Sequence, residues 1–302
     1  MIRKRNKRTI VKAARGPVVP NTTWQIASYP TKLYRTCPRR GSHVVIPSYS
    51  LPSGTSCPSA VYTDSVKGNK AVCGICYAET IIKMRVNVKD SHDARWNHSV
   101  MGMRAWARLY KSGMTTDQMI IHITRGIRGY GNDHDVISDD FKVAYNYMAS
   151  VINAMVIGIE PQLSCSCCKD SLRIRWHPSG DVYNVAYAQM LRIIFTILTR
   201  WYESLLIWVP TRNDHPHVKA DLRDATMSLS DIRGVNIVSS GLYVNELDTA
   251  HLNVSSSIVV SGWQNMPEPY TACHAQTSPE HICARCDACY IPGSKVAYKQ
   301  HR

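Results

Sequence analysis

Short apolar segments that end in polar residues or glycine recur after residue 168, and this pattern constrains the fold more than any other feature. Residues 172–176 run into His-Pro-Ser-Gly-Asp, and residues 205–209 run into Pro-Thr-Arg-Asn. An amphipathic helical pattern over residues 185–203 lies between them. This alternation is typical of a parallel α/β sheet. Three more segments follow the same rule: residues 225–229, 235–238 and 258–260. We therefore predict a TIM-barrel-like α/β fold, as a complete or an incomplete barrel.

The chain before this region is expected to form helices after a loop-rich segment. Helical patterns cover residues 90–110, 116–128 and 138–157, and Thr115 or Thr116 is expected to cap the second. Ser138 and two aspartates open the third, as suits a helix N-terminus. Residues 22–78 are predicted to be loop with short strands such as residues 43–47. We expect one catalytic domain with cysteine-rich metal-binding segments over residues 21–302, after a flexible basic arm over residues 1–20.

Positive charge is concentrated at the N-terminus. The formal net charge is +14, and residues 1–63 contain no aspartate or glutamate. Such a segment suits the phosphate backbone of DNA through counterion release, although a solubilising tail has the same composition. We predict DNA contacts for five residues of the arm: Arg3, Lys4, Arg5, Lys7 and Arg8.

No membrane partner is expected. The sequence has no stretch of eighteen uncharged apolar residues, as a transmembrane helix would require. The basic N-terminus is not followed by the apolar core and cleavage site of a secretory signal. In a chain that is not exported the cysteines stay reduced, so metal binding is favoured over disulfides.

The closing cysteine group has the most specific spacing among the eleven cysteines. It reads Cys283-x-x-Cys286-x-x-Cys289, and Cys273 or His274 is a candidate for a fourth ligand. Thiolates at this spacing can converge on one centre. The group suits a tetrahedral Zn²⁺ site or a [4Fe–4S] cluster with one open iron.

Two other cysteine groups are less regular. Cys73 and Cys76 form a CxxC pair, and Cys57 is a candidate third ligand on a loop. The remaining group comprises Cys165, Cys167 and Cys168, for which core packing, an extra ligand and a redox pair all remain open.

Asp181 is the carboxylate most suited to catalysis. Proline and glycine before it predict a sharp turn at a strand end, which would project His177, Ser179 and Asp181 into one cleft. A carboxylate there suits a nucleophile or base, and His177 suits a proton carrier. The alternative is that Asp181 only caps the following helix. Arg212 and Asn213, at the next strand end, suit phosphate or base-edge contacts; the alternative is an ordinary surface turn.

The order of several motifs resembles the "gene product 88" family of tailed-phage proteins. The similarity covers residues 45–290 and includes the segment Leu51 to Pro58, the CxxCYA pair, the Trp-His-Pro-Ser-Gly-Asp strand end and the closing cysteines. It implies a protein of the cytoplasm of an infected host cell. The CxxCYAE segment also resembles phage proteins regarded as radical-SAM-like, although the radical-SAM spacing is CxxxCxxC.

In outline the chain is also similar to the tRNA-guanine transglycosylase superfamily. That resemblance implies a DNA-modifying enzyme in which Asp181 attacks C1′ of a deoxyguanosine and a 7-deazaguanine base replaces guanine. The superfamily's CxCxxC zinc pattern is not matched cleanly. A DNA base-exchange enzyme is therefore the first expectation; the alternatives are a radical-SAM-like [4Fe–4S] enzyme and a non-enzymatic, metal-stabilised DNA-binding protein.

Overall fold

A parallel sheet forms the centre of the computed structural model, which describes residues 34–36, 43–53, 55–58, 72, 86–127, 138–165, 168–177, 180–245, 255–277 and 288–300. Seven strands pair in the order β3-β4-β5-β6-β7-β9-β8, and every pairing is parallel. Their bounds are β3 Ser48–Tyr49, β4 Leu172–Trp176, β5 Leu205–Thr211, β6 Val235–Val244, β7 Ser255–Val260, β8 Thr271–Ala272 and β9 Lys295–Lys299. β1 (Tyr34–Thr36) and β2 (His43–Val45) form a separate antiparallel pair.

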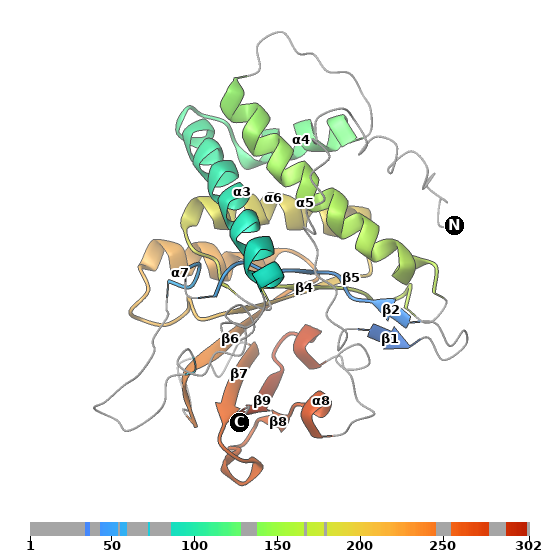
Figure 1. Ribbon diagram of the computed structural model, residues 1–302, viewed down its shortest axis with the longest axis vertical. Helices are drawn as coiled ribbons and strands as arrows, with labels where there is room; N and C mark the ends of the chain where they lie inside the picture. Colours follow the sequence, from blue (N-terminus) through green and yellow to red (C-terminus); the bar gives the residue numbers. More distant parts are fainter. Residues whose placement is uncertain are drawn as a thin grey trace.

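The first five strands of the sheet are added in chain order, and this order controls where the helices lie. Crossover connections between parallel strands are right-handed. When successive strands are added in the same direction across a sheet, their connecting helices therefore lie on one face of it. The helices α3 (Val86–Lys111), α4 (Thr116–Ile127), α5 (Asp139–Leu163), α6 (Val185–Trp201) and α7 (Ala220–Met227) gather on one side of the strands (Figure 1). Sequential strand order with helices on one side is also how a TIM barrel is wound. Here β3 and β8 are the edges of an open sheet, within the described part of the chain.

The predicted α/β class is therefore confirmed, with one strand assigned wrongly. The predicted strands at residues 172–176, 205–209, 235–238 and 258–260 lie in β4, β5, β6 and β7. Residues 225–229 instead belong to α7 and to the 3₁₀ helix Ser228–Asp231. The buried residues of α7 and of this 3₁₀ helix are Leu222, Thr226 and Leu229. They are four and three residues apart, which is the spacing of one helix face. The short strands β8 and β9 were not predicted.

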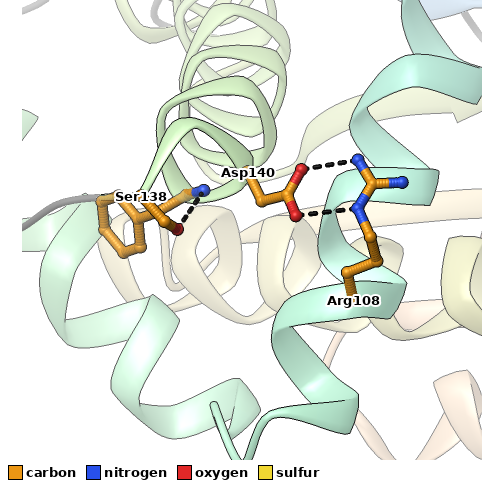
Figure 2. A network of polar contacts seen from close by, with 4 residues as sticks. Arg108, Ser138 and Asp140 are labelled. Carbon is orange, nitrogen blue, oxygen red and sulfur yellow. Dashed lines mark hydrogen bonds and ion pairs between the residues drawn. The ribbon is translucent and has the colours of Figure 1, made fainter.

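Capping side chains begin the predicted helices where the sequence places them. Thr115 and Gln118 form a capping box before α4: the Gln118 amide donates to Thr115 Oγ1 (3.2 Å), and the Thr115 amide donates to Gln118 Oε1 (2.8 Å). Ser138 accepts the Phe141 amide at the start of α5, and Asp140 in the first turn of α5 forms a bidentate pair with Arg108 of α3 (Figure 2). This exposed ion pair orients the two helices but contributes little to stability.

The two faces of the sheet differ in chemistry. Ile174 and Trp176 of β4 point toward the helices and join one large core cluster that includes Phe195 of α6. The alternate residues Arg173 and Arg175 point the other way, because side chains alternate along a strand. We call this second side, opposite α3–α7, the inner face. Among the helices that the structure describes, none is long and apolar enough to cross a membrane.

Candidate active-site edge and cysteine cluster

Asp181 lies at the carboxyl edge of the sheet, where it links the ends of β4 and β5. Its Oδ1 accepts the Val182 amide (2.7 Å) and the Thr211 hydroxyl (2.7 Å), and its Oδ2 accepts the Arg212 amide (2.8 Å). Asp181 does not cap α6. That role belongs to Asn184, whose side chain accepts the Tyr187 amide. The helix-cap alternative is therefore wrong, and the carboxylate instead joins two strand ends.

Burial dominates the electrostatics of this carboxylate. Asp181 is only 3% exposed. Burial raises its pKa from 3.8 to about 6, and the hydrogen bonds from Arg212, Thr211 and Val182 limit the rise. At neutral pH the group is therefore ionised but poorly solvated. A carboxylate in this state is more reactive as a base or nucleophile than one in water.

His177 directly follows β4 in an unusual backbone conformation. Its φ is 49°, a region that non-glycine residues rarely adopt, and the residue is 2% exposed. Its Nε2 lies 3.2 Å from the hydroxyl of Tyr187 on α6. Strained residues of this kind concentrate at functional sites. His177 and Asp181 are both buried at the carboxyl edge of the sheet, and the projection of their side chains into one cleft stays a prediction.

A cluster of buried hydroxyls next to His177 was not predicted. Tyr49 and Tyr147 share a hydrogen bond of 2.9 Å, and Ser99 and Tyr183 share one of 2.8 Å. The ring of Tyr183 stacks on that of Tyr187 at 4.5 Å. Burial raises the pKa of these tyrosines, so they remain protonated hydroxyl donors. The sixteen tyrosines against two phenylalanines were a sequence signal for such a network, but helical spacing cannot say which of them meet.

The segment after β3 packs against the turn that carries Asp181. The His177 amide donates to the Tyr49 carbonyl (2.8 Å), and the Asp181 amide donates to the Ser56 carbonyl (3.1 Å). Gly180 fits between them with φ +81°. Two motifs more than a hundred residues apart in the sequence are thereby joined at one edge, and half-buried Cys57 lies in the same segment.

Gly180→Ala is expected to disrupt this junction. The new Cβ would lie 2.5 Å from Ser56 Oγ and 2.9 Å from Leu51 Cβ, in a backbone conformation that disfavours a side chain. We expect the free energy of unfolding to fall by roughly 2–4 kcal/mol in urea titrations. Gly113→Ala is the matched control, because Gly113 has φ +100° but no atom within 4 Å of the added Cβ. Equal losses in both variants would show that the junction is not tightly packed.

The polar residues after β5 serve the interior more than the surface. Asn213 is fully buried, and its amide donates to the Val182 carbonyl and to Thr226 Oγ1. It therefore joins the segment after β4 to α7 and does not offer its side chain to a base, contrary to the sequence expectation. Arg212 is half-buried, and its Nε donates to the Gly241 carbonyl at 3.4 Å. The five basic residues predicted to contact DNA lie outside the described residues.

Only part of the predicted metal ligands can be located. Cys57 lies at the carboxyl edge, whereas Cys273 and Cys289 lie near Tyr298 of β9, with Cys289 Sγ 3.1 Å from its hydroxyl. Four predicted ligands lie outside the described residues, namely Cys73, Cys76, Cys283 and Cys286. No group of three metal-ligating side chains converges within the described part of the chain. Cys165 and Cys168 pack against each other, and Cys167 also lies outside the described residues.

The fold and the site define a class: an open, parallel α/β protein with a buried carboxylate and a histidine at the carboxyl edge of its sheet. No protein-family model, curated protein or solved structure matches the chain. The chemistry of its own residues therefore carries the functional proposal.

Proposed function

We propose that the chain is a DNA-modifying enzyme that exchanges guanine for a 7-deazaguanine base, with Asp181 as nucleophile. The observation that carries the proposal is the position of this carboxylate. It is buried at the carboxyl edge between β4 and β5, where parallel α/β enzymes hold their reacting groups. Although burial raises its pKa to about 6, the carboxyl group is still mostly ionised at neutral pH.

The two carboxylate oxygens have different partners, which assigns their roles. Oδ1 accepts two hydrogen bonds and orients the group, whereas Oδ2 accepts one, from the Arg212 amide. In the proposed reaction Oδ2 attacks C1′ of the target nucleotide, and the C1′–N9 bond breaks as guanine leaves with a proton from His177. The incoming 7-deazaguanine then returns a proton to His177 and attacks C1′, and the ester bond to Asp181 breaks.

Access to Asp181 requires movement in this scheme. The carboxylate is almost completely covered, and the Leu51–Ser56 region packs on the turn before it. The target base must leave the DNA stack to reach such a site. The positive charge of the chain supports DNA as the substrate, since phosphate contacts supply most of the non-specific affinity.

Asp181→Asn tests the proposal directly. We expect incorporation of a radiolabelled 7-deazaguanine base into duplex DNA to fall by about 10³-fold or more, because the amide is no nucleophile. DNA binding, measured by fluorescence anisotropy, should stay within about twofold, since the affinity comes from phosphate contacts. Asp214→Asn is the matched control, because Asp214 is a second buried carboxylate and follows the next strand, β5. An Asp181→Asn variant that incorporates the base at the wild-type rate would contradict the assignment.

A second candidate function is favoured by a different observation. Cys57 lies in the segment after β3, the edge strand from which β4 to β7 follow in chain order. This segment lies at the carboxyl edge of the sheet. A cysteine-bound [4Fe–4S] cluster there would supply electron transfer to a bound substrate. Anaerobic purification of wild type and Cys57→Ser separates the candidates: a brown wild-type protein whose iron and acid-labile sulfide are lost in Cys57→Ser supports this function, and a colourless wild-type protein or an unchanged variant opposes it.

A further inference from the structure

A segment near the C-terminus lies over the inner face of the sheet. Tyr290, in the 3₁₀ helix η7 (Ala288–Tyr290), packs on Trp208 of β5 and Val238 of β6. Asn236 of β6 donates from Nδ2 to the carbonyls of Cys289 (2.9 Å) and Ile291 (3.3 Å). The backbone of Cys289 is therefore fixed by a side chain from the middle of the sheet.

A second contact strengthens this attachment. Ser255 of β7 donates to Asn236 Oδ1 (2.7 Å) and accepts the Gly293 amide (2.8 Å). Buried polar side chains in a sheet are costly unless their hydrogen bonds are satisfied. Here they are satisfied by the segment that carries Cys289, which indicates that the position of this segment is specified.

Cys273 reaches the same region from the other side of β9. Its amide donates to the Ala297 carbonyl (2.8 Å), and the pairing of Ala272 with Ala297 places Cys273 beside Tyr298. Parallel neighbours in register point to the same face. The side chain of Cys273 is buried, whereas His274 is exposed on α8 (His274–Thr277). Cys273 therefore faces the region of Cys289, whereas His274 occupies the adjacent exposed position.

Tyr298 connects the two cysteines. Its hydroxyl lies 3.1 Å from Cys289 Sγ. A phenol hydroxyl at this distance can donate a hydrogen bond to a thiolate. Such a donor is what metal-bound thiolates commonly receive from their surroundings.

A cation lies on the same face. The guanidinium of Arg175 stacks over the Trp208 ring, 4.4 Å from the ring centroid. Among the residues that the structure describes, Arg175 Nε is buried without a hydrogen-bond acceptor. An anionic group on the inner face would offset this charge.

We propose that Cys273 and Cys289 ligate the same metal centre on the inner face, with the Tyr298 hydroxyl as hydrogen-bond donor to the Cys289 thiolate. The centre takes a thiolate-binding metal, either zinc or the iron of an iron–sulfur cluster. Tyr298 and Arg175 are positioning residues that compensate the charge of the thiolates. This inference goes beyond the proposed function and does not depend on the role of Asp181.

Metal retention in three variants of the full chain tests the proposal. After anaerobic purification, metal content per chain is measured by mass spectrometry, and metal loss to a chelator is followed in time. Cys273→Ser is expected to lose metal at least ten-fold faster than wild type, whereas His274→Ala, at the adjacent exposed position, should match wild type. Tyr298→Phe should keep the metal but release it about ten-fold faster. The identity of the metal distinguishes zinc from iron.

Alkylation of the wild-type protein gives a second test that needs no variant. Cys273 and Cys289 should become reactive toward iodoacetamide together when the chelator is added, while Cys165 and Cys168, which pack against each other elsewhere, should not change. A wild-type protein without metal would overturn the proposal. So would metal that stays bound in Cys273→Ser, or a chelator that exposes only one of the two cysteines.

Discussion

Trp176→Ala is expected to lower the free energy of unfolding by about 3–5 kcal/mol, the largest effect of any single truncation proposed for this chain. Trp176 is fully buried at the end of β4. Its ring stacks on Tyr49 with centroids 4.9 Å apart and meets the edge of Phe195 at 4.9 Å. The truncation would leave a cavity between the sheet and α6 that neither neighbour can fill without moving. Urea titration followed by circular dichroism measures the loss.

Trp263→Ala is the matched control for this prediction. Trp263 begins the 3₁₀ helix Trp263–Asn265 and is only partly buried against the small cluster near β7 and β9. The same truncation should therefore cost clearly less there, since less apolar surface returns to water. If both variants lose the same stability, the junction of β3, β4 and α6 is not the main core. Because His177 follows Trp176 directly, the core truncation should also abolish base exchange.

The stability of the wild-type protein is expected to fall as the pH rises through 6, through the ionisation of Asp181. Its pKa is about 6 in the folded chain and 3.8 in the absence of burial, so the folded state binds more protons between these values. The contribution of Asp181 is fully present below the lower value and is lost as the pH rises through the higher one. The loss is on the order of 3 kcal/mol for a fully buried group.

The measurement is the difference in unfolding free energy between wild type and Asp181→Asn as a function of pH. The variant has no charge to bury, so the difference should shift in favour of the variant as the pH rises from about 4 to about 7. Asp140→Asn is expected to show the opposite pH dependence of this difference in unfolding free energy. The Arg108 hydrogen bond lowers the pKa of Asp140, so that contribution is present at neutral pH and is lost as the pH falls through the acidic range. A flat difference for Asp181→Asn would show that the carboxylate is not buried in solution.

Local patterns in the sequence were sufficient for the class of fold and for part of the site. The alternation of apolar strands and an amphipathic helix predicted the parallel sheet, and Thr115 and Ser138 marked the helix starts. The Pro-Ser-Gly segment before Asp181 predicts a strand-end turn, and His177 and Asp181 both lie at the carboxyl edge of the sheet. These features depend on residues close together in the chain, which is why they can be read without the fold. At residues 225–229 the local pattern predicts a strand, but the apolar residues there have helical spacing and belong to α7 and the following 3₁₀ helix.

The partners of the site residues were decided by the tertiary structure alone. Asp181 takes Thr211 and the Arg212 amide from thirty residues away, and the hydroxyls around His177 come from β3, α3, α5 and α6. The position of Cys273 beside Tyr298 follows from the pairing of β8 with β9. Strand order and register determine all of these contacts, and they arise from packing between distant segments that no local periodicity encodes. The sequence by itself therefore determined that a carboxylate stands at a strand end, and only the sheet decided that it is buried and linked to the neighbouring strand.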